Sequence, residues 1–192
     1  TGCADIAFKE FLPDLSLPKV LRKLGYRTVA RVSMPVLNRS TLLSRDFDDY
    51  KLMPNHNDFK GMIDEMEFPD GEPHYYFLNL GETHYPYMLS GADLPHISGV
   101  HGALKGMDES PATAGKQSFE PGQMEMLRLQ QIKCVEYIDG QVGRLMALTP
   151  PGTHFIVTAD HGELFGEDGY FGHGPVMHEK CFEVPFVEGR IG

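Results

Sequence analysis

An Asp-His pair in the last third of the chain has the residue types and the setting of a metal site. Asp160 and His161 follow a short apolar run, residues 154–157, which predicts a buried strand. Ligands of open α/β sheets collect at the carboxyl ends of strands, and carboxylate oxygen with imidazole nitrogen suits zinc, manganese and other divalent cations. Gly162 would remove a side chain where the backbone turns away from the ion. The simpler alternative is that Asp160 caps the following turn and His161 is an ordinary surface histidine.

Two further histidines occupy places where a site could form. His173 lies within a Gly-His-Gly step, residues 172–174, and the unperturbed pKa of histidine suits proton transfer or contact with an anion near neutral pH. His84 follows an apolar strand pattern at residues 75–80 and precedes Pro86. The alternatives are a solvated loop histidine and a strand-end histidine bonded to the backbone. The acidic neighbours of the Asp-His pair are predicted to be loop and cap residues: Glu163, Glu167 and Asp168.

The elements that position these residues alternate between helix and strand. The pattern predicts helices over residues 17–24, 58–66 and 123–148, and strands over residues 27–33, 75–80, 154–159 and 182–187. Residues 35–53 are expected to be mostly connection, and residues 90–119 a long loop near the site. Alternation of this kind predicts a mainly parallel sheet with helices on both faces, in one domain. Six apolar residues of the long helix are expected to pack on that sheet: Leu127, Ile132, Val135, Ile138, Val142 and Leu145.

Composition excludes several classes of protein. The formal net charge of −10 over 192 residues disfavours nucleic acid and anionic membranes as partners, because such surfaces need clustered Lys and Arg. It does not exclude a small anionic substrate, since a bound cation would set the local field. No apolar run reaches the length of a membrane span, and no signal peptide is visible. The compartment stays open, with the cytoplasm favoured. The three cysteines form neither a disulfide framework nor a metal-binding spacing, and Cys134 is predicted to be a small buried hydrophobe.

Several segments resemble, in the same order, motifs of the sulfatase-like members of the alkaline phosphatase superfamily. Residues 156–175 read IVTADHGELFGEDGYFGHGP and are similar to that family's strand, (S/T)-D-H-G-E, Gly-rich loop and His-Gly step. Other matching segments are the helix of residues 123–148, FLNLGETHYPY at residues 77–87, SLPKVLRKLGYRT at residues 16–28 and FDDY at residues 47–50. The resemblance covers nearly the whole chain and is weakest over residues 90–119. Two positions depart from the family pattern, His178 in place of Tyr and Glu183 in place of a common Arg.

The resemblance implies a three-layer α/β sandwich with a mainly parallel central sheet, truncated at its N-terminus. An Asp pair and the nucleophile (Ser, Thr, or a Cys or Ser oxidised to formylglycine) would lie upstream of Thr1, and Cys3 lacks the pattern of that nucleophile. Asp160 and His161 would supply half of a calcium, zinc or manganese site. His173 would contact the transferred group or protonate the leaving oxygen, and His84 would contact the substrate.

Two functions of different classes follow. The first is a metal-dependent hydrolase or transferase that acts on a small anionic sulfate or phosphate ester through a covalent enzyme intermediate. The second is a non-catalytic member of the family, in which the fold serves as a binding or scaffolding module. Retention of Asp160, His161, His173 and His84 favours the enzyme, because a scaffold has no evident need for all four. The sequence does not distinguish sulfate from phosphate esters and does not give the oligomeric state.

Overall fold

Parallel strands form the sheet of the N-terminal part of the chain, as the sequence predicts. The computed structural model describes residues 16–89, 121–173 and 176–192. The chain divides into two units, residues 1–81 (unit 1) and residues 82–192 (unit 2). One domain over the whole chain therefore stays a prediction. The expected long loop of residues 90–119 and the terminal Cys3 lie outside the described residues.

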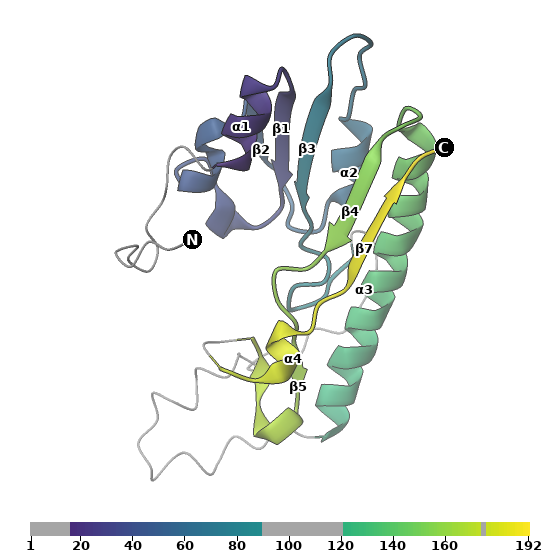
Figure 1. Cartoon of the computed structure of the whole chain (residues 1–192). Coiled ribbons are helices and arrows are strands. Elements are labelled where there is room, and N and C mark those ends of the chain that lie inside the picture. Colours follow the sequence, from purple (N-terminus) through teal and green to yellow (C-terminus); the bar gives the residue numbers. More distant parts are fainter. Residues whose placement is uncertain (1–15, 90–120, 174–175) are drawn as a thin grey trace. The chain divides into compact units, whose positions relative to one another are not determined.

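The sheet of unit 1 has three parallel strands in the order β2-β1-β3 (Figure 1). The central strand β1, Arg27–Val32, pairs on one side with β2, Asp49–Leu52, and on the other with β3, His74–Asn79. The mixed α/β class and the parallel pairing are thereby confirmed for these strands. The pattern did not predict β2, which is short and half charged (Asp-Tyr-Lys-Leu), so that residues 35–53 resembled a connection.

Two short helices of unit 1 lie within two residues of their predicted bounds. Helix α1, Leu17–Lys23, follows Ser16, has proline in its first turn and is terminated near Gly25, whose φ of 87° is readily adopted only by glycine. Ser16 makes no side-chain capping bond. Helix α2, Phe59–Asp64, is capped by Asp58, whose carboxylate accepts from the Gly61 N–H at 3.0 Å. Two 3₁₀ turns, η1 (Pro35–Leu37) and η2 (Leu42–Asp46), connect β1 to β2.

A partly exposed carboxylate at the start of the sheet joins α1 to β1. Asp48 Oδ2 accepts from the N–H and the hydroxyl of Thr28 at 2.9 and 3.0 Å, and its Oδ1 lies 2.8 Å from Arg22 Nε. Burial alone would raise the pKa of Asp48. The Thr28 hydrogen bonds and the positive charges of Arg22 and Arg27 outweigh that effect, so that the pKa lies below its ordinary value.

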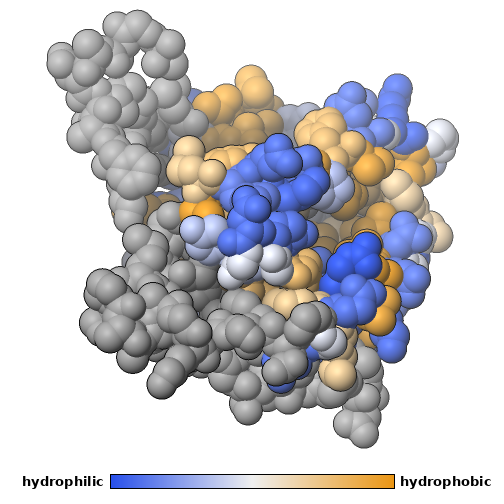
Figure 2. All heavy atoms as spheres, turned by 90° about the horizontal axis from the view of Figure 1, so that it is seen from below, coloured by the Kyte–Doolittle hydropathy of each residue, from blue (hydrophilic) through white to orange (hydrophobic). Residues whose placement is uncertain are grey.

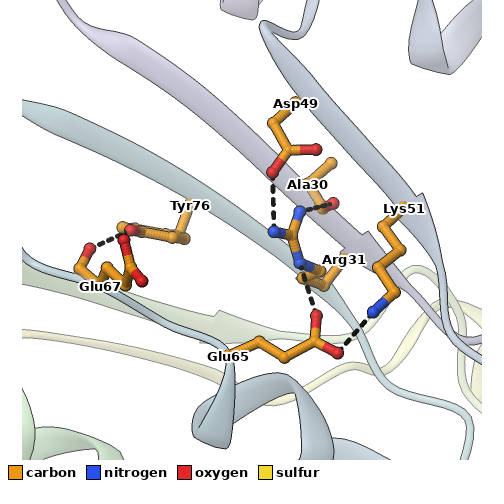
Figure 3. A network of polar contacts seen from close by, with 7 residues as sticks. All are labelled: Ala30, Arg31, Asp49, Lys51, Glu65, Glu67 and Tyr76. Atoms are coloured by element: carbon orange, nitrogen blue, oxygen red, sulfur yellow. Dashed lines mark hydrogen bonds and ion pairs between the residues drawn. The ribbon is translucent and has the colours of Figure 1, made fainter.

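A buried guanidinium links three elements of unit 1 (Figure 3). Arg31 on β1 is only 11% exposed, donates to the Ala30 carbonyl at 2.9 Å, and lies 2.7 Å from Asp49 on β2. Its Nε lies 3.3 Å from Glu65, the residue that follows α2, and Lys51 contacts the same carboxylate at 2.5 Å. The planar guanidinium presents donors in several directions, so Arg31 can bind Asp49 of β2 and Glu65 after α2 at the same time.

Unit 2 contains the long helix α3, Pro121–Leu148, which confirms the helix predicted over residues 123–148. Four of its buried side chains follow one another at intervals of three or four residues, and a fifth lies about three turns farther along: Met124, Leu127, Gln130, Cys134 and then Leu145. Cys134 is fully buried, as predicted. Of the expected apolar stripe, Leu127 and Leu145 are buried, but Ile132 and Val135 are 38% and 52% exposed. That part of the prediction is wrong because the buried face passes through the polar Gln130, which an apolar pattern does not mark.

The strand before the Asp-His pair belongs to an antiparallel ribbon. Strand β4, His154–Thr158, pairs with β7, Phe186–Arg190, so that Val157 lies opposite Val187. Residues of β4 alternate between exposed and half-buried, so the expectation of a buried strand is wrong. Among the described residues, its one sheet neighbour is antiparallel. Strand β7 begins only after Pro185 because proline lacks the N–H that the ladder needs, whereas the sequence predicted a strand over residues 182–187.

A small hairpin and a one-turn helix complete unit 2. Strands β5, Leu164–Phe165, and β6, Phe171–Gly172, pair antiparallel around the 3₁₀ turn η4, Glu167–Gly169. Helix α4, Glu179–Phe182, is capped by His178, whose Nδ1 accepts from the Lys180 N–H at 3.1 Å.

Apolar side chains also remain at the surface, and Figure 2 shows them beside hydrophilic residues on the face that it presents. No helix of the described ranges is long and apolar enough to cross a membrane.

Candidate metal centre

The Asp-His pair lies directly beyond the end of β4 and is held there by α4. The Thr158 hydroxyl donates to the Pro185 carbonyl at 2.8 Å, and the Gly162 N–H donates to the Cys181 carbonyl at 2.9 Å. A Cβ atom on residue 162 would lie 1.9 Å from the Lys180 carbonyl oxygen, a separation that real Cβ atoms do not show. Glycine is therefore needed at position 162 because α4 approaches the backbone closely, a reason different from the predicted turn away from an ion.

The β5–β6 hairpin brings together two residues that are ten positions apart. Leu164 pairs with Gly172, so that Glu163 and His173 are the next residues outward on the two strands. Leu164 and Phe171 are buried at 0% and 1% exposure and anchor the hairpin in the core of unit 2. Register and packing together fix Glu163 opposite His173.

Glu163 and His173 form a half-buried ion pair. His173 Nδ1 lies 3.0 Å from Glu163 Oε2, and the side chains are 31% and 7% exposed. The hydrogen bond to Glu163 raises the pKa of His173 above its ordinary value. Burial opposes that effect, while the charges of Glu163 and Asp160 add to it. Nδ1 is occupied by this bond, so Nε2 of His173 is the nitrogen that can meet a metal or a substrate.

His161 stacks on His173. The ring centroids are 3.6 Å apart and the planes differ by 22°. His161 Nδ1 lies 2.8 Å from the Gly162 carbonyl oxygen, which can only accept, so Nδ1 carries the proton and Nε2 keeps its lone pair. A backbone carbonyl on the second nitrogen is the usual partner of a metal-binding histidine.

His84 adds a third imidazole to the same place. Its ring meets His173 edge-on, with centroids 5.6 Å apart and planes at 72°. His84 Nδ1 donates to the Tyr85 carbonyl at 2.8 Å, which again leaves Nε2 available. Helix α3 holds this loop, because Gln130 and Gln131 donate to backbone carbonyls of residues 86 and 83 at 3.3 and 3.4 Å. The rings of His84 and His161 thus both contact His173. The sequence showed these histidines only in separate motifs and could not show that they meet.

The predicted ligand Asp160 lies at the rim of this group. Its side chain is 86% exposed, and Oδ1 lies 3.7 Å from His161 Nε2, too far for a hydrogen bond. Two ligand atoms of one tetrahedral zinc ion lie roughly 3.3 Å apart, given bonds of about 2.0–2.2 Å. The distance between Asp160 Oδ1 and His161 Nε2 is close to that value, and Nε2 is the nitrogen of His161 that the backbone carbonyl leaves free. Asp160 therefore stays a predicted ligand.

Glu163 is the residue that sequence reasoning missed. It was expected to be a loop or cap residue, yet one ligand atom each of His161, Glu163 and His173 lie within 4.8 Å of one another. Two imidazoles and a carboxylate, all half-buried or nearly buried, are a donor set that suits zinc or manganese. The available signal was its position two residues after His161 and directly before the apolar pair Leu164-Phe165. The residues present therefore fit a divalent ion. His161 belongs both to the predicted pair with Asp160 and to the group with Glu163 and His173.

Comparison with known proteins gives a limited similarity. A stretch of 58 residues is 34% identical to a protein of Escherichia coli (strain K12) described as the uncharacterized sulfatase YidJ. The match covers 28% of this chain and 12% of that protein's length. No family model matches the chain, and no solved structure matches it. The chain is thus similar, over a limited segment, to a protein described as a sulfatase.

Proposed function

We propose that this chain is part of a metal-dependent hydrolase or transferase acting on a sulfate or phosphate ester through a covalent enzyme intermediate. The observation that carries the proposal is the convergence of His161, Glu163 and His173 at one half-buried place, with His84 beside them. The limited likeness to a sulfatase supports it. We also infer that the parallel strands of unit 1 belong to the three-layer sandwich that the resemblance implies.

Each residue has a distinct role in this proposal. Asp160 and His161 would hold a divalent ion, with Glu163 as the nearest further ligand. When bound, such an ion neutralises charge on the ester oxygens and lowers the pKa of a coordinated nucleophile. Glu163 orients His173 through Nδ1 and favours the protonated ring. Nε2 of His173 is then the donor for the leaving oxygen, and His84 contacts the transferred group.

The ligand role is tested by metal binding to the chain. The protein is stripped with a chelator, and the rise in melting temperature on adding zinc, manganese or calcium is measured for wild type and for His161→Ala. His154→Ala is the matched control, because His154 is an exposed histidine at the other end of β4. We expect a rise in wild type and in the control that His161→Ala abolishes. Equal rises in all three proteins would refute the assignment of His161.

The reaction is tested on the full-length protein with 4-nitrophenyl sulfate and 4-nitrophenyl phosphate in the presence of the ion that binds. Turnover of one ester, lost in His173→Gln, supports the proposal and names the ester class. Metal binding without turnover of either ester by the full-length protein contradicts catalysis and supports the binding module.

A further inference from the structure

A buried tyrosine packs against the hairpin that carries Glu163 and His173: the ring centroids of Tyr87 and Phe165 lie 5.8 Å apart. Tyr87 is 0% exposed and packs in the core of unit 2 with Leu127, Cys134 and Phe171. Its hydroxyl oxygen is buried and has no hydrogen-bond partner among the described residues. An unsatisfied buried hydroxyl destabilises the folded state, whereas phenylalanine would fill the same space without that cost. The hydroxyl therefore needs a polar neighbour to account for it.

Glu163 is the polar neighbour that we assign to this hydroxyl, because it directly precedes β5 and the Phe165 ring of β5 packs on Tyr87. Burial raises the pKa of Tyr87 far above its ordinary value, and the charge and hydrogen-bonding capacity of Glu163 raise it further. The hydroxyl is thus a permanent donor close to a carboxylate that is 7% exposed. A carboxylate offers about four lone-pair positions, and His173 uses only one of those on Glu163. The Glu163 carboxylate can therefore accept a second hydrogen bond, from the Tyr87 hydroxyl directly or through one buried water.

Contacts within the His84 loop and with α3 hold the backbone of Tyr87. Its N–H donates to the His84 carbonyl at 2.8 Å, and its φ of 58° is unusual for a tyrosine. Gln130 of α3, 2% exposed, donates to the Pro86 carbonyl at 3.3 Å. The edge-on contacts of the Tyr85 ring with Tyr87 and Phe171 complete the support. The hydroxyl is therefore presented by a rigid part of unit 2.

We propose that Tyr87 is a positioning residue whose buried hydroxyl donates a hydrogen bond to Glu163, directly or through one water, and thereby fixes that carboxylate against His173. Glu163 is held from the core by Tyr87 and meets His173 toward solvent, so the two contacts together set its rotamer. The consequence for metal affinity rests on the proposed function, whereas the contact itself does not.

The test compares Tyr87→Phe with Tyr85→Phe. The control removes a hydroxyl from the same aromatic cluster and leaves the Tyr85 carbonyl in place for His84. Zinc affinity is measured by competition with a chromogenic chelator. Loss of a group that supports a metal ligand costs about 10–100-fold in affinity, so we expect at least tenfold weaker binding for Tyr87→Phe and a change below about twofold for the control. Equal affinities in wild type and both variants would overturn the inference.

A measurement on the metal-free wild-type protein decides the contact without any variant. In NMR spectra with labelled tyrosine, we expect a slowly exchanging Tyr87 hydroxyl proton with a nuclear Overhauser effect to the Glu163 side chain, or to a bound water that also contacts it. Its absence overturns the inference even if Tyr87→Phe fails to fold. If wild type binds no zinc, the proposed function fails, and the hydroxyl signal still decides the role of Tyr87.

Discussion

Neutralising Glu163 should destabilise the metal-free protein in a pH-dependent way. Glu163→Gln keeps the size of the side chain and removes the charge that pairs with His173 at 3.0 Å. Two unit charges about 4 Å apart attract by about 4 kcal/mol at an effective dielectric constant of about 20, and desolvation offsets much of this. Hydrogen bonds to charged groups contribute a net of about 1.5–3 kcal/mol. Because His173 stays 31% exposed, we expect a loss of about 1–2 kcal/mol in the free energy of unfolding.

The sign of the pH dependence follows from His173. The pKa of His173 in the folded protein is raised above its ordinary value of 6.5, so the stabilisation is fully present below about pH 6.5 and is lost as pH rises through the folded pKa. The loss caused by Glu163→Gln should therefore be largest near pH 5.5 and shrink by about pH 8.5. Urea unfolding followed by circular dichroism, with chelator present, measures it at both values. Tryptophan fluorescence is not an option, because the chain has no tryptophan.

A double-mutant cycle with His173→Gln isolates the pair from other effects of the two substitutions. Glu188→Gln is the matched control, because Glu188 lies on the exposed strand β7 of the same unit. A coupling free energy near zero at pH 5.5 would refute the reasoning. So would a Glu163→Gln effect of equal size at the two pH values, since the pair would then owe nothing to protonation of His173.

Two further predictions concern stability. Gly162→Ala should cost about 3 kcal/mol or more in the free energy of unfolding, because its Cβ would lie 1.9 Å from a carbonyl oxygen of α4. Gly189→Ala, which has nothing within 4 Å of its Cβ, is the control, and equal urea midpoints for the two variants would contradict the close approach. Asp48→Asn should cost about 1 kcal/mol at pH 7. The folded pKa of Asp48 is lowered, so its contribution is present above the ordinary value of 3.8 and is lost as pH falls through the folded pKa. The difference from wild type should vanish by about pH 2, and Asp70→Asn should show none at either pH; a cost that persists in acid would exclude the ionic explanation.

The sequence predicted elements whose patterns are local and long. Helix α3 and strands β1, β3 and β4 appear within a few residues of their expected bounds, because apolar spacing and flanking glycine or proline mark them. It failed at β2, which is too short and polar to show a period, and at the phase of α3, where Gln130 replaces an apolar residue. The antiparallel pairing of β4 with β7 was also hidden, since strand partners depend on contacts about thirty residues apart.

The same division applies to the site. Residue type and motif alone singled out His84, Asp160, His161 and His173, because ligands of open α/β sheets collect at the carboxyl ends of strands. Only the tertiary structure decided that three of these imidazoles meet and that Glu163 joins them. The hairpin register sets Glu163 opposite His173, and the Tyr85–Tyr87 loop, held by α3, brings His84 beside them. Such juxtapositions depend on packing and loop closure across long separations, which local periodicity does not encode.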